Sequence, residues 1–341
     1  MTTTLPDIDA VTQRLPPGYR ARPFRDEDRE PLTAARNAEL PEVEQQSAAE
    51  WREWERLVPD PAQVRVIVET GASDEIAAFL NVGNGGPFRA PDGSARGGID
   101  VARAHRRKGL GGALLPFLEE EARRLSAPKL YSGVSAREPE SLSWAQARGF
   151  KEIGRRIEAA IDLNAFEPAK WEERARKTIE QGIRLVSLDS LRQELDDARF
   201  EALTREIYDV EAEAWEDVPV AGPFPHWQYD VFRRLMLESP SSALDLDILA
   251  LDGDKLVAFT SSYRNQGGKK GGTGFTGTLR SHRGRGIAFT LKVDVLGRAK
   301  NSGLRWMLTT NDEPNKAMRG INYTLGYEPL PAHIQLEKQL S

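Results

Sequence analysis

The stretch SHRGRGIAF, residues 281–289, has a close counterpart in AHRRKGLGG, residues 104–112. Both stretches follow the pattern Arg-x-x-Gly-x-Gly/Ala, carry a histidine just before the first arginine, and continue into an apolar pattern with helical spacing. Superposing them puts Arg106 on Arg283, a displacement of 177 residues. The same basic, glycine-rich turn therefore occurs twice in one chain, each time at the start of an expected helix.

The repeat extends beyond the two turns. Downstream, the Gly-Phe pair at 149–150 falls on the Gly-Tyr pair at 326–327, and upstream EIAAFLN (75–81) matches KLVAFTS (255–261). A period this long indicates a duplicated domain, and 341 residues exceed what one hydrophobic core usually serves. We predict an N-terminal domain over 1–165, a charged linker helix over 166–182 that acts as a spacer with a solvated face, and a C-terminal domain over 183–341.

Both copies have the same coarse order of elements, with period-2 stretches for strands and period-3.6 stretches for helices. The strands expected in the first copy are 19–24, 64–69, 76–83, 97–103, 129–134 and a closing strand 156–163, with helices at 26–40, 49–57, 109–125 and 139–148. The strands expected in the second copy are 183–188, 246–251, 255–263, 273–280, 305–310 and 332–339, with helical segments up to about 238, from 286 and from 313. Pro116 should kink or shorten the helix that follows the first turn.

Composition excludes several classes of chemistry. The chain has no cysteine, so disulfides, a thiolate nucleophile and Cys-ligated zinc are ruled out, and no histidine pair has metal-ligand spacing, so we expect no metal. A net charge of −5 argues against broad nucleic-acid binding. No run of about 18 apolar residues and no signal-peptide pattern occurs, so we expect a cytoplasmic protein that makes no membrane contact.

The repeated turn has the chemistry of an anion site. A strand that passes through Arg-x-x-Gly-x-Gly into a helix presents unpaired N–H groups and the positive end of a helix dipole at one point, which attracts phosphate. Glycine lets the backbone approach an oxygen, and the basic side chains complement a diphosphate. The nucleotide-hydrolase string Gly-x-x-x-x-Gly-Lys-Ser/Thr is absent, and the dinucleotide fingerprint fails at Leu114 and Leu291. Coenzyme A is the best remaining ligand.

These features together resemble motifs A and B of the GNAT superfamily of N-acetyltransferases: a strand, Arg-x-x-Gly-x-Gly/Ala, an amphipathic helix, a strand, and a helix ending in Gly-Phe/Tyr. The resemblance covers nearly the whole chain, twice, as in tandem GNAT proteins, and the second copy matches more closely through Asn311, Asn315, Met318 and Asn322. It implies an α/β (α+β) fold of two tandem domains. Each would be a mixed, mostly antiparallel twisted sheet with flanking helices, and acetyl-CoA would be the cofactor.

The resemblance also implies which residues hold the cofactor. The strand before each turn offers backbone groups to the pantetheine arm, the turn holds the diphosphate, and Asn315 hydrogen-bonds the arm, whereas Glu138 at the matching place could weaken binding in the first copy. The implied residues are Val101, Arg103, Arg106, Arg107, Lys108, Gly109, Leu110, Gly111 and Gly112 in the first copy, and Thr278, Leu279, Arg280, Arg283, Gly284, Arg285, Gly286, Ile287, Ala288, Asn311 and Asn315 in the second.

The proton acceptor is an open question. An amine attacks a thioester only when it is neutral, so a base should lie near the strand that precedes the turn. In the first copy Asp100 stands where the family often places its acidic base, although a structural hydrogen bond is the alternative. The second copy has no carboxylate in GGTGFTGT, so the loop WEDVPVAGPFPHW would have to supply Glu216, Asp217 or His226, which could equally be ordinary loop residues.

The proton donor is open as well. Many GNAT enzymes have a tyrosine seven residues after the asparagine position, but Asn322 and Ala145 stand there in this chain. We keep Asn322 as a candidate catalytic residue beside Asp100 and Asp217. We expect His105 and His282 to pack or hydrogen-bond within their turns rather than to catalyse.

The leading hypothesis is a direct transfer of the acetyl group from acetyl-CoA to a primary amine of a small molecule. The C-terminal domain would be the more active one, and the N-terminal domain would shape the substrate groove or bind cofactor without turnover. The alternatives are a non-catalytic acyl-CoA-binding or sensory protein, which the missing tyrosine permits, and a nucleic-acid-associated factor, against which the pI of about 5.7 weighs. We expect a monomer or a homodimer.

Overall fold

The computed structural model of the chain describes residues 7–60, 63–86, 89–219, 226–265 and 268–340. Internal contacts divide these residues into two compact units. Unit 1 runs to Arg155 and resumes at His333, and unit 2 comprises the described residues between Arg156 and Ala332.

Unit 1 is built around a six-stranded sheet in the order β1-β2-β3-β4-β5-β13. Its strands pair antiparallel, except that β4 and β5 are parallel. The elements are α1 (Ile8–Arg14), β1 (Tyr19–Pro23), η1 (Asp26–Asp28), α2 (Arg29–Asn37), η2 (Glu42–Glu44), α3 (Ala48–Leu57), β2 (Val64–Thr70), β3 (Ile76–Gly83), β4 (Ala95–Val101), η3 (Arg103–His105), α4 (Leu110–Arg124), β5 (Lys129–Ser135), α5 (Pro139–Gln146) and β13 (His333–Gln339).

Unit 2 has a sheet in the order β6-β11-β10-β9-β8-β7, with the short β12 also paired to β6. Only β10 and β11 are parallel. The elements are β6 (Lys151–Asp162), η4 (Pro168–Trp171), α6 (Glu172–Ile179), β7 (Ile183–Ser187), α7 (Leu188–Glu194), α8 (Asp197–Trp215), α9 (Tyr229–Leu237), β8 (Ile248–Asp252), β9 (Lys255–Arg264), β10 (Lys270–Thr278), η5 (Arg280–His282), α10 (Ile287–Asn301), β11 (Trp306–Asp312), α11 (Lys316–Leu325) and β12 (Glu328–Pro329). The predicted pair of mixed, mostly antiparallel sheets is confirmed.

The last strand of each sequence repeat pairs outside its own repeat. Residues 156–162 of β6, expected to close the first copy, pair antiparallel with β11 of unit 2. Strand β13, at the end of the second copy, pairs antiparallel with β5 of unit 1, from His333 opposite Ser135 to Gln339 opposite Lys129. The period-2 pattern specified that both segments are strands but contained no information on their partners.

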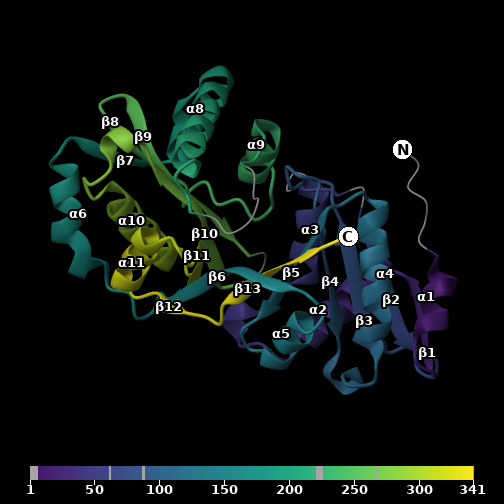
Figure 1. Cartoon of the computed structure of the whole chain (residues 1–341). Coiled ribbons are helices and arrows are strands. Elements are labelled where there is room, and N and C mark those ends of the chain that lie inside the picture. Colours follow the sequence, from purple (N-terminus) through teal and green to yellow (C-terminus); the bar gives the residue numbers. More distant parts are fainter. Residues whose placement is uncertain (1–6, 61–62, 87–88, 220–225, 266–267, 341) are drawn as a thin grey trace. The chain divides into compact units, whose positions relative to one another are not determined.

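The core of unit 2 is split between the two faces of its sheet. Along β8, Ile248 and Ala250 join the cluster that includes α10, whereas Leu249 and Leu251 join the cluster that includes α8 and α9. This alternation is the period-2 pattern of a strand covered by helices on both faces. Figure 1 shows α8 and α10 on opposite sides of these strands.

Unit 1 is layered in the same way. Alternate residues of β2 and β3, such as Val66 and Leu80, pack in the cluster that includes α4, whereas Phe79 points to the other face. There its ring meets Trp51 of α3 and Phe24 at centroid distances of 6.0 and 5.8 Å. Trp51 of this helix is thus part of the packed aromatic cluster, whereas Trp54 is exposed.

A helix precedes the first strand of each sequence repeat, β1 or β7, and packs against the helix that follows the turn: α1 against α4, and α6 against α10. The sequence predicted α6 as a solvated spacer and did not predict α1. Thr178 of α6 is buried, so this helix is more than a spacer. Pro116 lies on the exposed side of α4, and the helix continues to Arg124, so the proline does not shorten it.

Candidate functional site

The two repeated turns have the same backbone conformation. Gly109 and Gly286 are the N-caps of α4 and α10, with φ of +88° and +81°. A side chain is strained in this left-handed region, which explains the glycine at both positions. Each turn is preceded by one short 3₁₀ turn, η3 in unit 1 and η5 in unit 2, which connects it to β4 or β10.

Backbone N–H groups are open at both turns. The first helical bonds run from Thr290 N to Gly286 O (3.0 Å) and from Ala113 N to Gly109 O (3.1 Å), so the earlier amides of each helix have no helical partner. Within the described chain, no backbone carbonyl accepts from the amides of Gly284, Arg285 or Gly286. Gly286 and Gly109 are exposed. The arrangement fits an anion such as a diphosphate.

The first arginine of each turn braces the strand before it. Arg283 Nε donates to the carbonyl oxygen of Thr278, and Arg106 Nε donates to that of Val101, both at 3.1 Å. The far end of each guanidinium pairs with a carboxylate: Arg283 Nη1 with Asp217 (2.7 Å) and Arg106 Nη1 with Glu138 (2.6 Å). These two arginines therefore fix the junction between strand and turn.

Asp217 is strongly ion-paired. Hydrogen bonds from Arg280 (2.7 Å) and Arg283 lower its pKa to about 2, and Arg280 also contacts Glu216 at 2.9 Å. A carboxylate held this way is a weak proton acceptor at neutral pH. Its position argues for a structural role at the turn.

His282 makes a contact within its turn, as expected, whereas His105 contacts residues outside its turn. His105 is buried and lies 3.0 Å from the hydroxyl of Tyr19 and 3.3 Å from Glu75. His282 contacts Ser281 Oγ at 2.8 Å and Asp252 at 3.4 Å.

The back of the second turn is supported by α6 and the residues after it. Thr178 Oγ1 and Gln181 Nε2 both donate to the carbonyl oxygen of Arg285 at 3.3 Å. A Cβ on Gly286 would lie 2.9 Å from Thr178 Oγ1. The sequence offered no signal for this support, because the helix lies about 100 residues before the turn.

The two parallel strands of each unit part before they end. In unit 2, pairing of β10 with β11 stops at Gly272 opposite Leu308, although both strands continue. In unit 1, pairing of β4 with β5 stops at Arg96 opposite Tyr131. Beyond each point, the facing edges present backbone N–H and C=O groups that the neighbouring strand no longer satisfies.

Strand β10 also carries a bulge. Its register against β9 shifts by one residue between Thr273 and Phe275, so Gly274 is the extra residue. Gly274 is exposed, and the amide of Phe275 donates to Ser261 Oγ at 3.0 Å in place of a strand carbonyl. Strand β4 pairs with β3 in continuous register. Sequence reasoning missed both Gly274 and Ser261.

Asp100 lies beyond the parting point of unit 1, opposite Phe79 of β3. Its side chain is exposed, and desolvation by nearby protein atoms raises its pKa against the opposing effects of Arg36 and Arg106. A carboxyl group with a raised pKa can accept a proton.

Asn322 and Asn311 contact one another on α11 and β11. Asn322 is buried and its Nδ2 donates to Asn311 Oδ1 at 2.7 Å, while its own Oδ1 has no hydrogen-bond partner within the described chain. Asn315 is the N-cap of α11 and accepts from the amide of Met318 at 3.2 Å. The three asparagines expected at the site are thus neighbours on one strand and one helix.

Two buried groups of unit 2 were not singled out by the sequence. Burial lowers the pKa of Lys292, on α10, to about 7, and its Nζ has no hydrogen-bond partner in the described residues. Glu211, on α8, is buried 3.5 Å from His226, and desolvation raises its pKa.

The remaining residues expected at the cofactor lie on the same two turns. They are Arg103, Arg107, Lys108, Leu110, Gly111 and Gly112 in unit 1, and Leu279, Ile287 and Ala288 in unit 2.

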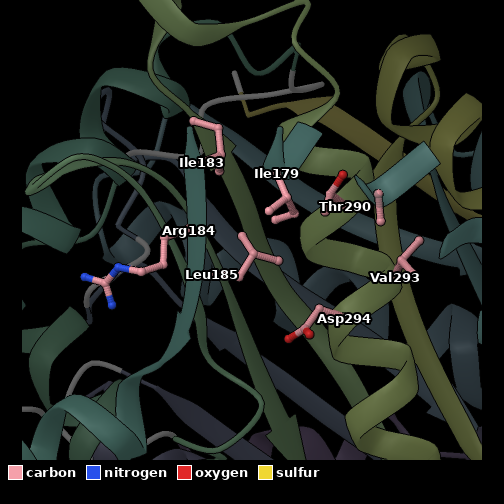
Figure 2. Close-up of a pocket in the computed structure, with 8 residues that line it drawn as sticks. Ile179, Ile183, Arg184, Leu185, Thr290, Val293 and Asp294 are labelled. Carbon is pink, nitrogen blue, oxygen red and sulfur yellow. The ribbon is translucent and has the colours of Figure 1, made fainter. Parts of the chain in front are cut away.

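Two hollows lie in unit 2. One, between α6, β7 and α10, is mostly apolar; Figure 2 shows Ile179 and Leu185 beside Thr290 of α10, with Arg184 pointing away. Its carboxylate, Asp294, is paired with Arg298 at 2.6 Å. The other hollow adjoins the end of β10 and is lined by Glu206, Asp209, Val210, Glu213, Asp254, Lys255, Leu256 and Leu279. The second hollow is therefore mainly acidic.

Two stretches of the chain, residues 24–150 and 204–327, match the acetyltransferase (GNAT) family. The chain belongs to this family. The two matches contain one repeated turn each and together cover more than half of the chain, so the duplication and the family resemblance are confirmed. GNAT proteins are acetyltransferases that use acetyl-CoA, and the open amides at the turn are suited to the charge of its diphosphate.

Solved structures share the GNAT fold over the whole chain. A GCN5-related N-acetyltransferase from Sphaerobacter thermophilus is 21% identical, with a TM-score of 0.70 and coverage of 96% of this chain and 97% of that chain. A tandem GNAT protein from the clavulanic acid biosynthesis pathway is 18% identical, with a TM-score of 0.69 and coverage of 95% and 99%. No curated protein matches the sequence.

None of the described helices combines the length and apolar character needed to cross a membrane. No group of three or more His, Cys, Asp or Glu side chains in the described part of the chain is arranged to hold a metal ion.

Proposed function

We propose that unit 2 transfers the acetyl group of acetyl-CoA directly to the primary amine of a small molecule. The observation that carries this proposal is the combination of two features in β10: it parts from β11 after Gly272, and it bulges at the exposed Gly274. The proposal places the thioester beside this bulge. The continuous register of β4 favours unit 2 over unit 1 as the place of acyl transfer.

The cofactor would follow the line of open backbone groups. Amides from Gly284 to Ala288 would hold the diphosphate, since the Arg283 amide already donates to the carbonyl oxygen of Arg280. The backbone of Thr278 and Arg280, with Asn311 and Asn315, would border the pantetheine arm. Acetyl-CoA supplies the activated acetyl thioester. The exposed glycines and the braced arginine support this assignment, because a preformed turn needs no rearrangement to receive an anion.

Direct transfer forms a carbon–nitrogen bond and breaks a carbon–sulfur bond, with one proton leaving the amine and one reaching the sulfur. Unsatisfied N–H groups beyond the parting point would stabilise negative charge on the carbonyl oxygen. Asn322 is buried, its amide donates to Asn311, and it has no acidic proton to give to the sulfur. Asp217 is held as an ion pair and Asp100 belongs to unit 1, so the proposal for unit 2 assigns neither as the base, and the proton of the amine would pass to solvent water.

A cationic small molecule is the acceptor that the charges favour. The hollow beside Leu279 contains Glu206, Asp209, Glu213 and Asp254, a set that would attract an ammonium group. In its two tandem GNAT regions the chain resembles mycothiol acetyltransferase, which is a further reason to propose small-molecule amines first.

The test is the release of free thiol from acetyl-CoA in the presence of a panel of primary amines. We expect release that depends on the amine and saturates with it. Binding of acetyl-CoA without amine-dependent release from any member of the panel would favour the alternative, a non-catalytic acyl-CoA sensor, which the asparagine at position 322 makes chemically reasonable.

A further inference from the structure

The two units differ at the residue that begins the second helix after the repeated turn, which is α11 in unit 2 and α5 in unit 1. In unit 2, Asn315 begins α11, and its short amide side chain accepts from its own helix. In unit 1 the equivalent residue is Glu138, which begins α5 and makes no capping bond. Its carboxylate instead accepts from Arg106 at 2.6 Å and lies 3.7 Å from Arg103.

By this equivalence Glu138 lies where the proposed site of unit 2 has Asn315, the residue that would border the pantetheine arm. Arg103 also pairs with Glu39 at 3.1 Å, so each of the two arginines has a carboxylate partner inside unit 1. In unit 2 the matching arginines pair with Asp217, which comes from the end of α8 and not from the start of α11. A carboxylate between the turn and the cofactor arm would repel the diphosphate, whereas one on the α8 side leaves that path clear.

Trp144 of α5 closes the same path from the other side. Its Cζ2 atom lies 3.1 Å from where a Cβ of Gly111 would be, so the indole rests against the first turn of α4. The Arg148 guanidinium stacks on the outer side of the ring at 4.1 Å, and the same residue donates to the carbonyl oxygen of Trp144. The indole is thus held between helix α4 and Arg148. The matching residues in unit 2 are Ala288 and Ile321.

The strands of unit 1 are also less open. A Cβ on Gly98 would lie 3.7 Å from Ser132 Oγ, so β4 and β5 remain in contact range just beyond their last paired residues. No residue is inserted in β4 to bend it away, in contrast to Gly274 in β10.

We infer that each chain binds one coenzyme A, in unit 2, and that Glu138 and Trp144 fill the equivalent slot of unit 1. This inference rests on the proposed function, because it assumes that the turn of unit 2 is a coenzyme A site. Unit 1 keeps the turn and its glycines as a structural copy whose ligand path is occupied by its own side chains.

The test is a calorimetric titration of the full chain with coenzyme A, which reports stoichiometry without requiring turnover. We expect one site per chain. Gly286→Ala should weaken binding by about tenfold or more, whereas Gly109→Ala, which adds the same methyl group at the same backbone conformation, should change it by less than about twofold. Ala288→Phe places an aromatic ring at the first turn of α10, where the ring of Trp144 from α5 lies against α4 in unit 1. This variant should weaken coenzyme A binding as Gly286→Ala does, without changing a glycine of left-handed conformation.

The gain of a site completes the test. Glu138→Asn combined with Trp144→Ile gives unit 1 the residues of unit 2 and should raise the stoichiometry from one to two. Two sites in the unaltered chain, or loss of the single site in Gly109→Ala, would overturn the inference. A stoichiometry that stays at one in the double variant would overturn the role of these two side chains. No binding at all would instead refute the proposed function.

Discussion

Arg283 donates from Nε to the carbonyl oxygen of Thr278, five residues earlier, at 3.1 Å. Arg106 makes the same bond to Val101 at the same distance. An arginine used in this way fixes the direction in which the strand leaves the sheet, and with it the direction of the amides that follow. Its planar fork can reach both a carbonyl and a carboxylate, which a lysine cannot do.

The first prediction tests that role. Arg283→Lys and Arg283→Gln should both weaken coenzyme A binding by about fivefold to tenfold, because each loses a hydrogen bond worth about 1 kcal/mol or slightly more. Calorimetry at constant ionic strength measures the effect, with Arg298→Lys, an exposed pair on α10, as the control. Wild-type affinity in Arg283→Lys would show that charge alone matters.

The second prediction concerns the bulge. Ser261→Ala leaves the amide of Phe275 without its acceptor, so the bulge should loosen and kcat should fall several-fold with little change in KM for acetyl-CoA. Asn81→Ala, at the matching position of β3, which pairs with β4 in continuous register, serves as the control. An equal fall in both variants would place the effect outside the bulge.

The third prediction is a pH dependence of stability. The folded pKa of Lys292 is about 7 against an ordinary value of 10.5, so between these values the unfolded chain binds more protons than the folded chain. The free energy of unfolding should therefore rise with pH across this window, through this group, by up to a few kcal/mol.

Lys292→Leu, which copies Leu115 of unit 1, should remove that slope and stabilise the protein near pH 7. Denaturant unfolding at several pH values measures both effects. Lys316→Leu, at an exposed position of α11, should leave the slope in place. An unchanged slope in Lys292→Leu would assign the pH dependence to another group.

The fourth prediction follows from the exchanged strands. Ile334 and Leu336 of β13 are buried in the core of unit 1 although they end the second repeat. Replacing either by alanine should cost about 2–5 kcal/mol, and hydrogen exchange should accelerate in β5 before it does so in β8. Gln339→Ala, exposed on the same strand, is the matched control. Faster exchange confined to unit 2 would contradict the pairing.

Local structure was largely predictable from the sequence. The two turns, the helices after them and most strands occur within a few residues of their expected bounds, because glycine, caps and hydrophobic period are local signals. Strand partners are not local. The alternating residues of β6 and β13 are compatible with either sheet, and only packing in three dimensions decides between them.

The backbone of the two repeated turns was predictable to the same extent. It follows from a short motif, so Gly109 and Gly286 stand at matching N-caps and, with their arginines, stay predicted cofactor residues. Ser261 and Thr178 were not, since each acts on a residue that is distant in sequence. Asp217 also lies close to the turn, but its ion pairs with Arg280 and Arg283 depend on how α8 ends beside that turn.

Because β13 completes the sheet of unit 1, the order of folding cannot follow the order of synthesis. A nascent chain emerging from the ribosome would expose the edge of β5 until Gln339 has left the exit tunnel, long after the rest of unit 1 has been made. Exposed strand edges recruit other strands. Chaperone protection of this edge during translation should therefore matter more for this protein than for one whose first domain is contiguous.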